Sequence, residues 1–216
     1  MNRKLSRVVI WSAVVVLGTA GSAVARLIEA IKVKGKVGSL VCRHSEAIVC
    51  DGGFPGTLQT DIFVSGEQFV TRSNTFPREA TNNLFATVIE SNSCTDESSG
   101  KFGSLPKAAR QNGLQSADLR GTIPLLDAED GTPAGTLRVD VEMRGVGATT
   151  TTKTKDRFAF ETPDGKTTVI TTTFRGKTRL ATAEGPLFLD GNLVDCTFDD
   201  ETLQDLEQGS RTVERR

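Results

Sequence analysis

The stretch Leu137-Arg138-Val139-Asp140-Val141-Glu142-Met143-Arg144 decides the fold class, because each apolar residue in it alternates with a charged one. Successive side chains of a β-strand point to opposite faces of the sheet, so a period of two places one face in a core and the other in water. The apolar residues of a helix would recur every three to four positions instead. This stretch therefore predicts a half-buried β-strand.

Segments of the same kind, rich in Val, Ile, Thr and Phe, follow one another from residue 57 onward. They cover residues 57–64, 68–72, 83–91, 116–123, 157–162, 166–174, 179–183 and 187–198, the last broken by a turn. Pro163-Asp164-Gly165 and Asp190-Gly191 separate such segments and predict hairpin turns. Together these patterns predict an all-β fold, either an antiparallel β-sandwich or a barrel, of about nine to eleven strands.

Two stretches predict helix instead. Residues 106–111 can form a turn or two before Asn112-Gly113. Residues 200–208 predict a short C-terminal helix, with Asp199 as its N-cap and Gly209 after its last turn.

The first 25 residues are organised as a secretory signal peptide. Arg3, Lys4 and Arg7 precede an apolar run over residues 8–17, and Ala23-Val24-Ala25 supplies the small residues of a cleavage site. An uncleaved anchor is the alternative, because residues 8–25 carry no charge and about 20 apolar residues span a bilayer. We predict a signal peptide over residues 1–25 and a single secreted or periplasmic all-β domain over residues 26–216, without a stable membrane anchor after cleavage.

Charge and aromatic content narrow the range of partners. Removing the signal peptide, with three basic residues and no acidic ones, takes the formal net charge from −1 to −4. This charge predicts no basic surface for nucleic acid. The only Trp is Trp11 and the chain has no Tyr, so Phe is the sole aromatic residue after the signal peptide. Phe lacks the hydrogen-bonding tip that Trp and Tyr offer, which disfavours a conventional sugar-binding surface.

Four cysteines remain after the signal peptide: Cys42, Cys50, Cys94 and Cys196. An even number in an exported chain predicts two disulfides, for which three connectivities are open. The short spacing favours Cys42 with Cys50, which leaves Cys94 with Cys196 as a long-range tie. A metal site at Cys42, His44 and Cys50 is the alternative, but the spacing departs from the paired C-x-x-C of structural zinc sites. We expect no metal and no other cofactor.

No catalytic residue is assigned. His44 is the only histidine, so any Ser-His-Asp or Cys-His arrangement would depend on it, and no G-x-S-x-G motif is present. Paired carboxylates stay open as catalysts, because Asp and Glu are plentiful and a sequence does not reveal their spatial pairing.

Lys32, Lys34 and Lys36 occupy alternate positions and would lie together on one face of a strand. One interpretation is a docking strip for an acidic partner. The favoured interpretation is an edge strand, whose lysines discourage aggregation.

Residues 135–185 contain Leu137-Arg138-Val139-Asp140-Val141, Arg157-Phe158-Ala159-Phe160, Thr173-Phe174-Arg175-Gly176 and Ala181-Thr182-Ala183-Glu184-Gly185. These strand and turn patterns are similar to the C-terminal half of uncharacterised secreted bacterial β-proteins. The chain departs from that group by having neither Trp nor Tyr in its sheet. The resemblance implies no particular activity.

Three functions are compatible with these observations. The first is a secreted, non-catalytic β-domain that binds a protein or surface component, and it needs an exposed apolar or charged patch. The second is a closed β-barrel that carries a small apolar ligand, which needs an internal cavity. The third is an extracellular carboxylate-dependent hydrolase, which needs two acidic groups within about 10 Å of each other. The expected partner is an extracellular protein or a small apolar ligand, and not nucleic acid.

Overall fold

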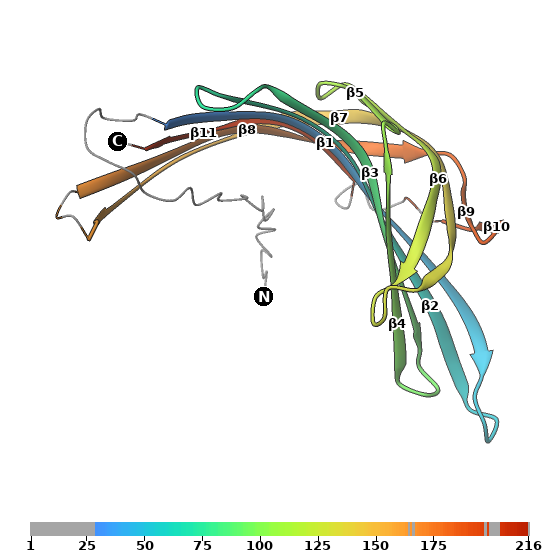
Figure 1. The fold of residues 1–216 in the computed structure, drawn as a ribbon. Helices are drawn as coiled ribbons and strands as arrows, with labels where there is room; N and C mark the ends of the chain where they lie inside the picture. Colours follow the sequence, from blue (N-terminus) through green and yellow to red (C-terminus); the bar gives the residue numbers. More distant parts are fainter. Residues whose placement is uncertain (1–28, 164, 166, 197, 199–203, 216) are drawn as a thin grey trace, which may run out of the picture.

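The computed structural model describes residues 29–163, 165, 167–196, 198 and 204–215 (Figure 1). The predicted signal peptide lies outside these residues. Within them every regular element is a β-strand, and eleven strands form one antiparallel sheet. The prediction of an all-β, antiparallel fold is confirmed.

The strands follow one another along the whole described chain. Their bounds are β1 (Glu29–Val49), β2 (Pro55–Ser73), β3 (Glu79–Asn92), β4 (Glu97–Pro106), β5 (Ala109–Asn112), β6 (Ser116–Asp127), β7 (Pro133–Glu161), β8 (Thr167–Glu184), β9 (Leu187–Leu189), β10 (Asn192–Val194) and β11 (Asp205–Arg215). Their order in the sheet is β10-β9-β7-β8-β11-β1-β2-β3-β4-β6-β5, and β6 also pairs with β7. Because β6 pairs with both β4 and β7, strands β1, β2, β3, β4, β6, β7, β8 and β11 close into a ring.

The strands continue well beyond this ring and form an arch (Figure 1). β7 leaves the ring at a register shift between Gly145 and Thr149, and its second half pairs with β8 alone. β5, β6 and β9 lie on the convex side of the bend (Figure 1). We call this convex side of β1–β3, β7, β8 and β11 the outer face and the concave side the inner face.

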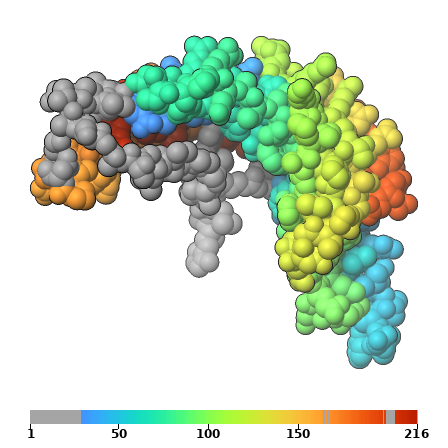
Figure 2. All heavy atoms as spheres, viewed as in Figure 1, coloured from blue at the N-terminus to red at the C-terminus, as the bar shows by residue number. Residues whose placement is uncertain are grey.

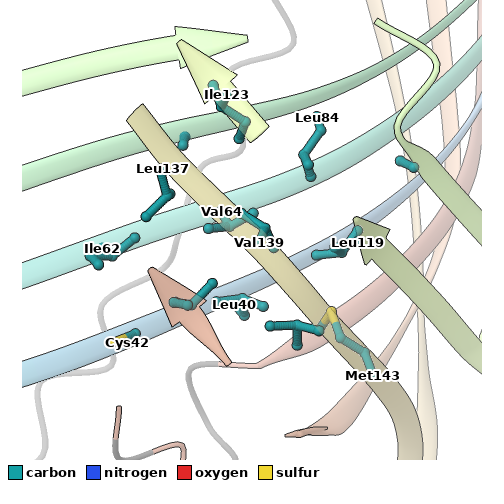
Figure 3. Packing of buried hydrophobic residues seen from close by; sticks show 14 of the residues in the cluster. Leu40, Cys42, Ile62, Val64, Leu84, Leu119, Ile123, Leu137, Val139 and Met143 are labelled. Carbon is teal, nitrogen blue, oxygen red and sulfur yellow. The ribbon is translucent and has the colours of Figure 1, made fainter. Parts of the chain in front are cut away.

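The core lies on the outer face, where β6 and β7 cross β1, β2 and β3 at a steep angle (Figure 3). Nearly all of its side chains are apolar and at most 1% exposed, and they include Leu40, Ile62, Val64, Leu84, Leu119, Ile123, Leu137, Val139, Val141 and Met143. Burying one such side chain stabilises the fold by about 1.5–3 kcal/mol. The alternation predicted over residues 137–144 is confirmed, because its apolar residues are buried and its charged ones reach the surface.

Both helix predictions are wrong within the described residues. Ala109–Asn112 forms β5, and Asp205–Arg215 forms β11. Leu206 is fully buried opposite Gly38 of β1, and Ser39 donates a hydrogen bond to Asp205. Burial and pairing with β1 and β8 therefore outweigh the helix propensity of this segment. Residues 199–203, including the predicted N-cap, lie outside the described part of the chain.

The hairpin predicted at Asp190-Gly191 is confirmed between β9 and β10. These residues have φ values of 50° and 85°, the left-handed conformation that an Asp-Gly turn favours. The Asp190 carboxylate also accepts a hydrogen bond from the backbone N–H of Thr136, at 2.7 Å. This side chain therefore ties the β9–β10 turn to the start of β7.

Candidate functional site

All four cysteines form disulfides, but the predicted pairing is wrong. Cys42 bonds to Cys196 and Cys50 bonds to Cys94, with Cα–Cα distances of 5.2 and 5.3 Å. Cys42 lies within extended β1 and Cys50 directly after it, so their Cα atoms are separated by about 26 Å of strand. A disulfide spans at most about 7 Å between Cα atoms, which excludes the local pair. Cys50 instead lies beside the β3–β4 turn that carries Cys94.

The alternative metal site at Cys42, His44 and Cys50 finds no support. The two cysteine sulfurs belong to different disulfides. Among the residues that the structure describes, no group of three or more His, Cys, Asp or Glu side chains is placed to hold a metal ion.

His44 lines a polar depression together with Arg43, Ser45, Gln59 and Asp195. Its Nδ1 atom lies 3.1 Å from the backbone carbonyl oxygen of Asp195. A catalytic histidine is normally oriented by a carboxylate and bonded to a nucleophile. Within the described residues His44 makes neither of these two contacts.

The inner face of the arch is rich in apolar side chains that no described strand covers. Residues directly opposite each other in antiparallel strands share a face. Phe63 lies between the core residues Ile62 and Val64, and so its side chain is on the inner face. The same argument from register places on this face Ile31, Val33, Val37, Phe69, Phe85, Ile89, Phe102, Phe158, Phe160, Ile170, Phe174 and Val213.

Seven of the eleven phenylalanines in the chain lie on this inner face, and several are well exposed. Phe158 is 64% exposed and Phe102 is 46% exposed. Phe158 and Phe160 lie side by side, with their ring centroids 5.8 Å apart. Drawn as spheres, the described atoms bend around a hollow on this side of the arch (Figure 2). The inner face is therefore a concave apolar surface.

A row of glycines crosses the inner face where β1, β11 and β8 pair. Gly35 is opposite Gly209, and Gly209 is opposite Gly176. The Phe174 ring lies over this row, since a Cβ atom added at Gly176 would be 2.6 Å from its Cζ and one at Gly209 would be 3.3 Å from its Cε2. The missing side chains let an aromatic ring lie flat on the backbone, as in aromatic rescue of glycine in a sheet.

Two carboxyl groups also lie on the inner face, on either side of Val37. Glu67 of β2 and Glu207 of β11 are both opposite Val37, which places their Cα atoms two strand spacings, or about 10 Å, apart. Burial raises the pKa of Glu67, which a hydrogen bond from Ser65 partly offsets. Burial also raises the pKa of Glu207, and the charge of Asp205 raises it further. Both pKa values move upward, whereas an acid–base pair needs them moved apart.

Sequence reasoning did not identify the inner face as a surface. The signal that it missed lies within β2, where Phe63 and Phe69 share one parity and the core residues Ile62 and Val64 the other. Two apolar sets of opposite parity indicate a strand with apolar side chains on both faces.

Comparison with known proteins adds no relative. No family model, no curated protein and no solved structure matches the chain. The described residues also include no helix that is long and apolar enough to cross a membrane.

Proposed function

We propose that the chain is an exported, non-catalytic binding protein that holds the apolar part of a ligand on its inner face. The observation that carries this proposal is the concave surface lined by Phe63, Phe69, Phe85, Phe102, Phe158, Phe160 and Phe174. Exposed apolar side chains gathered on one face mark an interaction site in a soluble protein.

The chemistry of the surface favours an acyl chain over a protein partner. Protein interfaces are enriched in Tyr, Trp and Arg, whose polar ends fix orientation. The apolar side chains of the inner face are Phe, Val and Ile, which contribute contact without a hydrogen-bonding tip. Arg211, opposite Val33 and Phe174, is a cation on the same face. The Phe174 ring over the glycine row adds apolar contact of the same kind.

The inner face, rather than the interior of the ring, is the proposed site. Leu40, Ile62, Leu119 and Leu137 are among the side chains that fill the space within the ring. A small apolar ligand would need that space in a closed-barrel carrier. We therefore place the apolar ligand on the open inner face and not inside the ring.

Export is part of the proposal. Two disulfides fit an extracellular or periplasmic location, because thiols in the cytosol are kept reduced. The predicted signal peptide over residues 1–25 and the resemblance of residues 135–185 to secreted bacterial β-proteins support the same conclusion.

The test is binding of a pyrene-labelled C16 fatty acid to three forms of the exported protein. These are the wild type, a Phe85→Ser/Phe102→Ser variant and a Phe54→Ser control. Phe54 is 69% exposed but lies at the β1–β2 turn. We expect the double variant to lose fatty-acid binding at least tenfold, about 0.7 kcal/mol for each ring lost, with an unchanged melting temperature, while the control binds like wild type.

Two outcomes would refute the proposal: no binding by the wild type, or equal loss in the double variant and the control. Native mass measurement of the protein taken from its exported fraction gives an independent reading. Export would be supported by the mass of a chain that begins at Arg26 and lacks the four hydrogen atoms that two disulfides remove. An additional mass of lipid size, lost on denaturation, would support binding.

A carboxylate-dependent hydrolase is the second candidate, and it rests only on the spacing of about 10 Å between the Cα atoms of Glu67 and Glu207, because their pKa values are not moved apart. Its test is hydrolysis of nitrophenyl glycosides by wild type and by the Glu67→Gln and Glu207→Gln variants. Activity that disappears in both variants would support the hydrolase, and absence of activity in wild type would reject it for these substrates.

A further inference from the structure

The outer face of the arch gathers basic side chains from strands that are far apart in sequence. Lys34 of β1 is opposite Ser210 of β11, which is opposite Arg175 of β8, which is opposite Lys153 of β7. Parallel rows of the same kind lie on either side of this one. We call the whole set the basic outer face, and its members are Lys32, Lys34, Arg72, Lys153, Lys155, Arg157, Arg175 and Lys177.

This arrangement corrects the edge-strand interpretation of the β1 lysines. β1 lies between β11 and β2, with partners along most of its length, and so Lys32, Lys34 and Lys36 protect no edge. Lys36 donates a hydrogen bond to the backbone carbonyl of Gln111 at 3.2 Å. The other two lysines are exposed beside the cations of the neighbouring strands.

Few acidic groups balance these charges. All eight side chains are exposed, and within the described residues no ion pair joins any of them to a carboxylate. On the same face of the six arch strands, the described acidic residues are Glu46, Glu90, Glu161 and Glu214, and Glu90 is paired with Lys101 at 2.7 Å. Asp156, Glu67 and Glu207 lie on the inner face.

Cations also face each other directly across strands. Arg72 is opposite Lys32, and Arg175 is opposite Lys153. Like charges in such pairs destabilise a sheet. Within the ring the same chain pairs unlike charges, for example Arg120 opposite Asp140 with 3.3 Å between nitrogen and oxygen. Among the described strand pairs, a cation lies opposite a cation only on the arch, where an external anion can neutralise both.

We infer that the basic outer face binds a linear, carboxylated polysaccharide. Cations two residues apart on one strand are about 7 Å apart, which offers a repeated set of contacts along a polyanion. Ser210 of β11 places a hydroxyl group between Lys34 and Arg175, and Thr212 places one beside Lys32. Both hydroxyls can bond to sugar hydroxyls.

Two other anionic partners fit less well. Among the described arch residues this face carries no aromatic side chain, whereas single-stranded nucleic acid is bound largely by stacking on aromatic rings. The face is also the convex one (Figure 1), so a flat bilayer would contact only part of it. The net charge of −4 predicted no basic surface, but a net charge does not describe how the sheet register separates charges between faces.

The test compares binding of polygalacturonate by the wild type, a Lys34→Gln/Lys153→Gln/Arg175→Gln variant and a control. The control, Lys107→Gln/Arg110→Gln/Arg138→Gln, removes the same charge from exposed cations elsewhere, none of which forms an ion pair within the described residues. We expect the first variant to bind about tenfold or more weakly at low salt, with a log–log salt slope shallower by about 2. The control should bind like wild type, neutral dextran should not bind, and the melting temperature of the first variant should equal or exceed that of wild type.

Several results would overturn the inference. They are no binding of polygalacturonate by wild type at low salt, equal weakening in both variants, and binding that does not change with salt. Tighter binding to phosphatidylglycerol vesicles or to an oligo-dT strand than to polygalacturonate would assign the face to a membrane or to nucleic acid instead. Fatty-acid binding on the inner face is a separate readout, so failure of either proposal leaves the other intact.

Discussion

Removing the Cys42–Cys196 disulfide is expected to destabilise the protein more than removing the Cys50–Cys94 disulfide. A disulfide stabilises mainly by restricting the unfolded chain, and its effect grows with the number of residues in the closed loop. The two sequence separations are 154 and 44 residues. In the loop-closure relation they correspond to about 5 and about 4 kcal/mol at 25 °C, a difference of about 1 kcal/mol.

Packing increases this difference. Cys42 is completely buried in the core cluster, so its replacement by Ala leaves a small cavity there. Cys50 is half-buried beside the β1–β2 turn. The Cys42→Ala/Cys196→Ala variant should therefore lose more of the free energy of unfolding than the Cys50→Ala/Cys94→Ala variant, by at least about 1 kcal/mol.

The assay is guanidinium denaturation of both variants and wild type without reductant. A peptide map under non-reducing conditions serves as the control, because each variant must retain the other native disulfide. Equal losses, or a larger loss in the Cys50→Ala/Cys94→Ala variant, would refute the loop argument. A map that links Cys42 to Cys50 in wild type would refute the connectivity itself.

Three further predictions concern charge, core and turn. Because burial raises the pKa values of Glu67 and Glu207, the stability that each carboxyl contributes is fully present below its ordinary pKa of 4.5 and is lost as pH rises through the raised value. The Glu67→Gln/Glu207→Gln variant should thus gain stability relative to wild type between pH 4.5 and pH 7 in urea titrations, and a difference independent of pH would contradict the assignment. Leu119→Ala should cost about 2–5 kcal/mol because Leu119 is fully buried, whereas Leu193→Ala, at a site 65% exposed, should cost less than about 0.5 kcal/mol; similar costs in thermal unfolding would reject the described core. Asp190→Ala should cost about 1–2 kcal/mol, because it places Ala at a positive φ and removes the acceptor of the Thr136 N–H; Asp190→Gly removes only the acceptor and should cost less, and equal losses in the two variants would show that the backbone conformation is not a cause.

The sequence predicted the strands well because the cause of a strand is local. Apolar residues alternate with polar ones wherever one face of a strand is buried and the other is solvated. Residues 137–144 show this alternation within one strand. The Asp190-Gly191 turn is equally local, since its left-handed conformation follows from the two residue types. Features that depend on neighbours within a few residues were therefore predictable.

Pairing between distant segments was not predictable from the same patterns. β11 has a weak helical signal, and only its position between β1 and β8 makes it a strand. The disulfide pairing depends on the 21-residue length of β1, because this extended strand holds Cys42 too far from Cys50 for the two to bond. The three β1 lysines carry the usual mark of an edge strand, yet the chain supplies a partner on each side. Each error has one physical origin, because alternation along a strand does not reveal which strands will lie beside it.

The two faces of the arch can be recognised in the sequence of a single strand, where the even-numbered positions change from lysines to apolar core residues. On β1 the apolar residues Ile31, Val33 and Val37 have odd numbers, but the core residues Leu40 and Cys42 have even ones. No bulge is present in the register of β1 with β2, so the strand does not rotate its faces between these two sets. The outer face of β1 therefore inverts its character, from apolar core within the ring to lysines beyond it, while the inner face carries apolar residues in both parts, including Val41 opposite Phe63. An inversion of this kind indicates a strand that leaves one packed layer and continues as a two-sided surface. In this chain that surface is apolar on one side and basic on the other.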